Sequence, residues 1–226
     1  MEPFVTDATA PSEWLIDAAD PLLTADRLAR IGDARRPDRL AWNTFRTLAL
    51  WNTDAWIPAL LETTCGEGGR LAALEWAGAQ VVPWGAGLDA GAVCDVVCDV
   101  VLDGPEAYVV VACALVANPP GGGTAIRAAA MAALDGSVHD AREAGLVVVS
   151  PQGWTGEQLR HAAAVELRDG RLASDLLEGA MGTVTWADLG RLAADLAEEG
   201  APDTIPEAQV RELIRQMGPL AGASGA

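Results

Sequence analysis

The chain has 226 residues, half of them hydrophobic, and a formal net charge of −17. That length fits one domain with a full core, and because no run approaches the roughly 18 apolar residues of a membrane span, we expect no membrane insertion. The charge disfavours nucleic acid as a partner, and the N-terminus lacks the pattern of a secretory signal, so we expect a cytoplasmic protein.

The first part of the chain carries helical signals. Thr24 or Asp26 can cap a short helix that ends near Ile31, and Pro37 opens a longer helix over about 38–51. Residues 56–62 continue as helix, and the tryptophans at 42, 51 and 56 are expected core anchors. All fifteen basic residues are arginine, and those clustered between positions 27 and 46 predict a solvated helix face.

Residues 94–116 predict a β-hairpin around which the rest of the chain is organised. The first arm alternates, so that Asp95, Asp99 and Asp103 share one face, and the segment DGPE has the composition of a turn. The second arm, Tyr108 to Val116, is a nearly unbroken apolar run, which is typical of a strand covered on both faces. A short strand precedes the hairpin in the segment GAQVVPWG.

Alternating helices and strands follow the hairpin. After a loop at 118–123 we predict a helix over 125–134, extended by 138–144, a buried strand over 146–149, and a helix over 156–165 capped by Thr155. The remaining predictions are a strand pair near 167–172, a strand over 181–185, a helix over 186–199, and a last helix from Pro206 to Met217. This order indicates an α/β or α+β domain with a central mixed sheet flanked by helices.

The expected domain organisation is simple. Residues 1–24 form an N-terminal extension, residues 25–217 a single domain, and residues 218–226 a disordered tail.

The aspartates of the first arm are candidate metal ligands. A cation such as Mg²⁺ would relieve the repulsion between carboxylates of Asp95 and Asp99 on one face. Alternatively, Asp95 ends the strand and Asp103 belongs to the turn, which leaves only Asp99 to explain. The cysteines at 65, 94, 98 and 113 lack the spacing of a zinc site, and we expect buried free thiols.

The order of these elements, with the segments WNTFRTL, DVVLDGPEAYVVVACAL and GLVVVSPQ, resembles the PD-(D/E)XK restriction-endonuclease-like superfamily over about residues 25–200. In that family an aspartate begins one strand, and a Glu-x-Lys pair on the next strand helps it to hold Mg²⁺ and a hydrolytic water beside a phosphodiester. The resemblance implies a restriction-endonuclease-like fold.

Matched to this family, Asp99 takes the place of its aspartate, whereas Ala112 and Ala114 stand where Glu and Lys belong. The family's helical acid falls near Asp38 or Glu62, and Gln152 follows a strand where some members carry a polar helper. The resemblance therefore implies a catalytically degenerate relative without a required cofactor, kept as a scaffold or binding module for a protein partner. The alternative within the family is a metal-dependent nuclease whose active site has been relocated.

A second family resemblance competes with the first. Residues 60–85 resemble the first motif of S-adenosylmethionine-dependent methyltransferases, in which Glu62, Gly66 and Gly68 would bind the cofactor. That reading requires a strand before Cys65, although the segment Trp56 to Leu61 has a helical pattern and contains Pro58.

Overall fold

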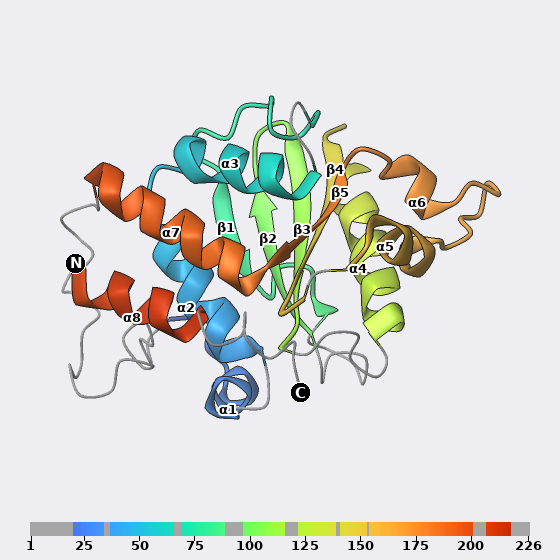
Figure 1. Cartoon of the computed structure of the whole chain (residues 1–226). Helices are drawn as coiled ribbons and strands as arrows, with labels where there is room; N and C mark the ends of the chain where they lie inside the picture. The colour runs from blue at the N-terminus through green and yellow to red at the C-terminus, as the bar shows by residue number, and fades with distance from the viewer. Residues whose placement is uncertain are drawn as a thin grey trace.

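The computed structural model describes residues 20–33, 37–65, 69–88, 97–115, 122–138, 141–152, 154–200 and 207–217. Within these residues, five strands form one mixed sheet in chain order: β1 (Gln80–Pro83), β2 (Cys98–Asp103), β3 (Ala107–Cys113), β4 (Glu143–Ser150) and β5 (Met181–Thr185) (Figure 1). β1, β2 and β3 are an antiparallel meander, whereas β4 and β5 continue in parallel. The expected sheet with flanking helices is thereby confirmed.

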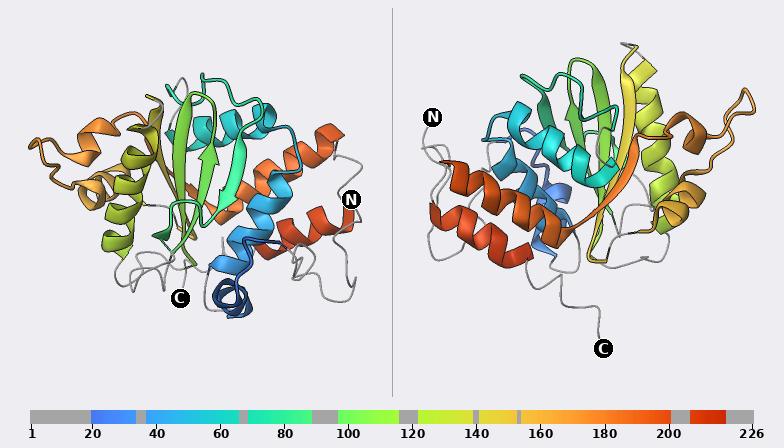
Figure 2. Two further views of the ribbon diagram at one scale, coloured as in Figure 1. Left: turned by 180° about the vertical axis from the view of Figure 1, so that it is seen from behind. Right: turned by 45° about the horizontal axis from the view of Figure 1, so that its top comes forward.

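Helices cover both faces of this sheet (Figure 2). One face carries α1 (Ala25–Gly32), α2 (Asp38–Leu48), α3 (Thr53–Cys65), α7 (Trp186–Gly200) and α8 (Glu207–Met217). The other carries α4 (Gly122–Val138), α5 (Gly156–Ala163) and α6 (Ala173–Leu176). None of the described helices is long and apolar enough to cross a bilayer.

Alternation along the hairpin divides its side chains between two cores. Val100 and Val111 pack toward α2 and α3, whereas Val101 and Val110 pack toward α4. Because both faces are covered, the apolar run of the second arm is buried on both sides, as predicted. The turn also forms where composition placed it, with the backbone N–H of Gly104 donating to the carbonyl of Ala107 at 2.9 Å.

Several local signals are confirmed at helix starts. The Thr24 hydroxyl accepts from the backbone N–H of Arg27 and caps α1. Thr155 forms a full capping box with Gln158 at the start of α5. The strand predicted over 181–185 is β5, and the tryptophans at 42, 51 and 56 are all buried.

Other predicted boundaries are wrong. The helix before β4 ends at Val138, and residues that were expected to extend it enter β4 from Glu143 instead. Gly145 explains why this segment suits the sheet, since a Cβ there would lie 2.5 Å from Leu71 and 2.8 Å from Val109. α2 ends at Leu48, α4 already includes Gly122, and the strand pair near 167–172 reduces to one bridge between Glu166 and Leu172.

A column of four side chains ties α1 and α2 to the turn after β1. The Trp84 and Trp42 rings stack with centroids 5.1 Å apart, and the guanidinium groups of Arg27 and Arg46 lie over the outer ring faces at 4.9 and 5.1 Å. Such cation–π contacts help to fix the helices on the sheet. Arg27 and Arg46 are therefore packing residues, and the prediction of a purely solvated arginine face is wrong for them.

Packed structure begins before residue 25. Leu23 is buried in the core, and Arg46 forms an ion pair with Asp20 at 3.0 Å. Residues 20–24 thus belong with the folded body, while the rest of the predicted extension and the tail at 218–226 lie outside the described residues.

Candidate functional site

Asp99 lies on β2 at the point where the turn after β1 crosses it. Its side chain is on the α4 face with Val97 and Val101 and is 1 % exposed. The carboxylate Oδ2 accepts a hydrogen bond from the backbone N–H of Ala86 at 2.8 Å, and the Asp99 carbonyl accepts from Trp84 at 2.7 Å. The residue therefore holds the turn at 84–86 against the sheet.

The positions opposite Asp99 are both alanine. Ala112 is the direct antiparallel partner of Asp99 across β2 and β3, and Ala114 follows it on the same face. Both methyl groups are buried in the core beneath α4, to which that helix contributes Ala125 and Ala129. Small apolar side chains thus occupy the place beside Asp99 where a second carboxylate and an ammonium would have to project.

Asp38 approaches the sheet from the other face. It is the first residue of α2 and is fully buried. Its Oδ1 accepts from the Arg30 guanidinium at 2.6 Å and from the Trp84 indole N–H at 3.1 Å. The Arg30 charge balances the carboxylate, so Asp38 serves as the buried hub that joins α1, α2 and the turn after β1.

The remaining predicted site residues do not gather around Asp99. Glu62 is exposed on α3, which covers the opposite face of the sheet, and Gln152 is exposed just after β4. Asp95, Gly66 and Gly68 lie outside the described residues. Asp38 and Asp99 are linked through Trp84, whose indole N–H donates to the Asp38 carboxylate and whose backbone N–H donates to the Asp99 carbonyl. The two carboxylates lie on opposite faces of the sheet.

The segment before Cys65 bears on the methyltransferase reading. It is helix α3, which runs from Thr53 to Cys65 and includes Pro58. A glycine loop that binds S-adenosylmethionine follows a buried strand in the Rossmann-type arrangement. Among the described residues no strand precedes the loop, and β1 starts only at Gln80.

Two thiols face each other beneath α2. Cys98 and Cys113 are direct partners across β2 and β3, and both are buried and free. Burial, and after it the Asp38 carboxylate, raises the pKa of the Cys98 thiol well above 9.0. Burial and the Asp99 carboxylate act in the same direction on the pKa of Cys113. Both groups stay protonated and unreactive at neutral pH, which confirms the prediction of buried free thiols for these two. Cys65 is free but only partly buried, and Cys94 lies outside the described residues.

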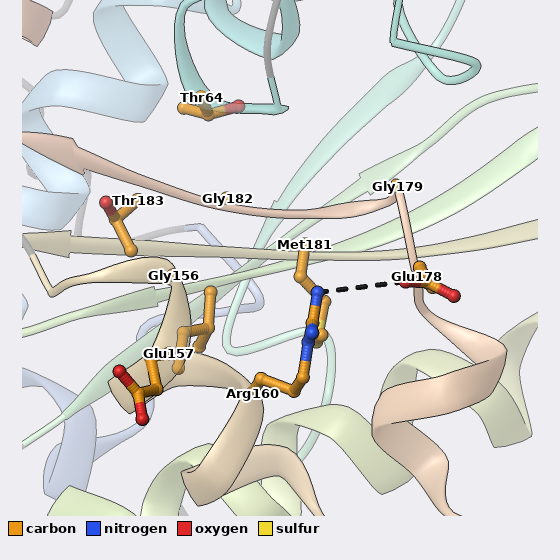
Figure 3. A pocket seen from close by; sticks show the side chains of 10 residues that line it. Thr64, Gly156, Glu157, Arg160, Glu178, Gly179, Met181, Gly182 and Thr183 are labelled. Atoms are coloured by element: carbon orange, nitrogen blue, oxygen red, sulfur yellow. Dashed lines mark ion pairs between the residues drawn. The ribbon is translucent and has the colours of Figure 1, made fainter.

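Sequence reasoning missed a pocket at the opposite margin of the sheet, beside β5 (Figure 3). It has a volume of about 440 Å³, and it lies between the last turn of α3 at Thr64 and the first turns of α5. Leu159 and Met181 supply apolar lining, while Glu157, Arg160 and Glu178 supply charge. The available signal was a glycine just before the short strand, Gly179, and a second one within it, Gly182.

Among the described residues, no three His, Cys, Asp or Glu side chains are close enough together to hold a metal ion. Comparison of the chain with models of protein families, with curated proteins and with solved structures finds no match.

Proposed function

We propose that this chain is a nuclease-like scaffold without nuclease chemistry, which acts as a binding module for a protein partner. The observation that carries the proposal is the register of β2 and β3, which sets Asp99 opposite the buried methyl group of Ala112. Metal-assisted phosphodiester hydrolysis needs carboxylates and a polarising cation at this place. Ala112 and Ala114 can supply neither.

The fold supports a restriction-endonuclease-like scaffold. Helices precede the β1–β2–β3 meander, and α4 then leads to the parallel strand β4, which is the element order of that superfamily. Asp99 also sits near the start of the second strand, where the family has its aspartate. In this chain its carboxylate instead accepts the Ala86 N–H and stabilises the turn.

Charge supports protein rather than nucleic acid as the partner. The net charge is −17, and many of the arginines are engaged within the molecule. Examples are the ion pairs of Arg30 with Asp38, of Arg70 with Glu143 and of Arg142 with Asp103. A polyanion would be repelled by this acidic surface, many of whose arginines are already paired, so a basic protein is the better match.

The test is calorimetric titration with Mg²⁺ and Mn²⁺, and separately with S-adenosylmethionine, using the wild type and Asp99→Asn, together with a plasmid-nicking assay. We expect no saturable binding and no nicking by either protein. Cation binding that Asp99→Asn abolishes, accompanied by nicking, would overturn the proposal in favour of a relocated nuclease site. Saturable S-adenosylmethionine binding that is indifferent to Asp99 would instead support the methyltransferase.

A stability measurement separates a structural Asp99 from a residual ligand. Asp99→Ala removes the acceptor for the Ala86 N–H, and we expect it to lower the free energy of unfolding by about 1.5–3 kcal/mol. Asp99→Asn keeps a carbonyl oxygen at that place and should lose less. Asp195→Ala, at an exposed site on α7, is the control. Equal stability of Asp99→Ala and the control would contradict the turn-holding role.

A further inference from the structure

β5 is the last strand of the sheet, and within the described residues it pairs only with β4. The ladder is parallel, with Leu146 opposite Met181 and the Leu146 N–H donating to the Ala180 carbonyl at 2.9 Å. Peptide groups alternate in direction along a strand, so those of Gly182 point toward β4. The N–H and C=O groups of Met181 and Thr183 therefore point away from it.

The pocket lies along this outer margin. α3 packs on one face of β5 so closely that a Cβ at Gly182 would be 2.2 Å from the Thr64 carbonyl oxygen. On the other face, Met181 packs with the α4–α5 core, and the Thr183 hydroxyl donates to the Trp154 carbonyl at 3.0 Å. α3 and α5 thus flank the outer edge of β5, and no further strand among the described residues pairs with it (Figure 3).

β5 also lacks the usual protection of an edge strand. Its sequence, MGTVT, contains no charge and no proline. Natural edge strands are commonly blunted by lysine, proline or a bulge, because open edges recruit other chains. The opposite edge strand, β1, does end in a proline at Pro83. The contrast marks the β5 edge as the side of the sheet that is suited to accept a strand.

The charges around the pocket are predominantly negative. Glu157 and Glu178 flank it, and the one cation among the lining residues, Arg160, is 3.7 Å from Glu178 with both side chains largely exposed. The partial negative charge of the terminal carbonyls of α3 at Thr64 is offset by the partial positive charge of the first N–H groups of α5, which begins at Gly156 across the pocket. The two glutamates therefore decide the sign. A cationic ligand is favoured here.

From this arrangement we infer that a basic, extended segment of a partner protein adds to the edge of β5. Its backbone would bond to the outward peptide groups of Met181 and Thr183, and its arginine or lysine side chains would lie by Glu157 and Glu178. Strand addition of this kind draws affinity from main-chain hydrogen bonds and selectivity from alternate side chains. The inference rests on the proposed binding function and names its surface. A second copy of the chain is disfavoured, because it would bring two acidic rims together.

The experiment measures fluorescence anisotropy of a labelled, terminally blocked peptide Arg-Val-Arg-Val-Arg, with two control peptides. One has the same side chains but N-methyl groups on alternate peptide nitrogens, and the other is Glu-Val-Glu-Val-Glu. We expect the basic peptide to bind, the N-methylated peptide to bind at least about tenfold more weakly, and the acidic peptide not to bind. Equal binding of the basic and N-methylated peptides would overturn strand addition.

Paired charge reversals locate the site. Glu157→Arg with Glu178→Arg should weaken binding at least about tenfold, whereas Asp195→Arg with Glu198→Arg on α7 makes the same change in net charge and should leave it nearly unchanged. Equal loss in both variants would assign binding to overall charge and overturn the β5 site. The inference would also be overturned if the wild type were a dimer and only the Glu157→Arg, Glu178→Arg variant were a monomer, because a second copy of the chain would then occupy the edge. Failure of peptide binding without cation binding or nicking refutes this site alone and leaves the proposed function standing.

Discussion

Asp38 shows how a buried charge is accommodated in this chain. One oxygen of its carboxylate receives both the Arg30 guanidinium and the Trp84 indole, which come from separate segments. Removing one partner of a buried ion pair costs far more than the pair itself contributes, since the other charge is left in the core. The family resemblance makes this residue a candidate for the helical acid of the active site, but its contacts are those of a structural junction.

The two buried thiols should make the free energy of unfolding depend on pH in the alkaline range. Burial raises the folded-state pKa of both Cys98 and Cys113 above the ordinary value of 9.0. Above that value the unfolded chain releases protons that the folded chain retains, so stability present at lower pH is lost as pH rises. We expect the free energy of unfolding to fall by about 1.4 kcal/mol per pH unit for each thiol in this range.

Urea unfolding at about pH 8 and about pH 10 checks this expectation. The control is the double variant Cys98→Ala with Cys113→Ala, which should show a shallower decline. Some decline should persist, because burial also raises the pKa of Cys65 and of Tyr108. An identical pH dependence in the wild type and the double variant would show that the two thiols do not titrate as their burial requires.

At the scale of elements, β5 lies so close to α3 at Gly182 that no side chain fits between them. Gly182→Ala would place a Cβ 2.2 Å from the Thr64 carbonyl oxygen, and a backbone atom cannot rotate aside. We expect the substitution to lower the free energy of unfolding by about 1–3 kcal/mol, because α3 must shift from the sheet. Chemical denaturation measures the change.

Gly156→Ala is the matched control for that substitution. It adds the same methyl group on the other side of the pocket, at the first residue of α5, where nothing lies within 4 Å of the new Cβ. Its stability should be unchanged or raised by up to about 1 kcal/mol. Equal destabilisation by the two substitutions would mean that glycine flexibility, rather than the contact with α3, sets the cost.

Local signals predicted most elements but not the contacts among them. Thr155 and Gln158 sit at the spacing of a capping box, and the alternation around Asp99 gave its face correctly. The hydrogen bond between Asp38 and Trp84 joins residues 46 positions apart in the sequence, and no local pattern predicts such a contact. The pocket beside β5 was missed for the same reason, because it depends on strand order and on where α3 ends.

At the scale of the whole molecule, charge dominates the expected behaviour. Many of the ion pairs are exposed, as between Arg171 and Asp169, and such pairs contribute little to stability. The net charge of −17 is repulsive in the folded state. Raising NaCl from about 10 mM to about 500 mM should therefore increase the urea midpoint, because the Debye length falls below the spacing of surface charges.

Urea is the suitable denaturant for that measurement, since it is uncharged and leaves the ionic strength under control. A midpoint that falls as salt is added would show that attractive ion pairs outweigh the repulsion. That result would also weaken the argument for a basic partner, because the acidic surface would then be balanced within the molecule.

The stacked indoles of Trp42 and Trp84 give the protein an optical reporter of its own. Two rings with centroids 5.1 Å apart and planes 25° from parallel couple their electronic transitions, which produces a paired band in circular dichroism that isolated tryptophans lack. One ring belongs to α2 and the other follows β1, so the band exists only while that helix is seated on the sheet. Its decay during gradual denaturation, compared with loss of the helical signal, would reveal whether this layer detaches before the rest of the molecule unfolds.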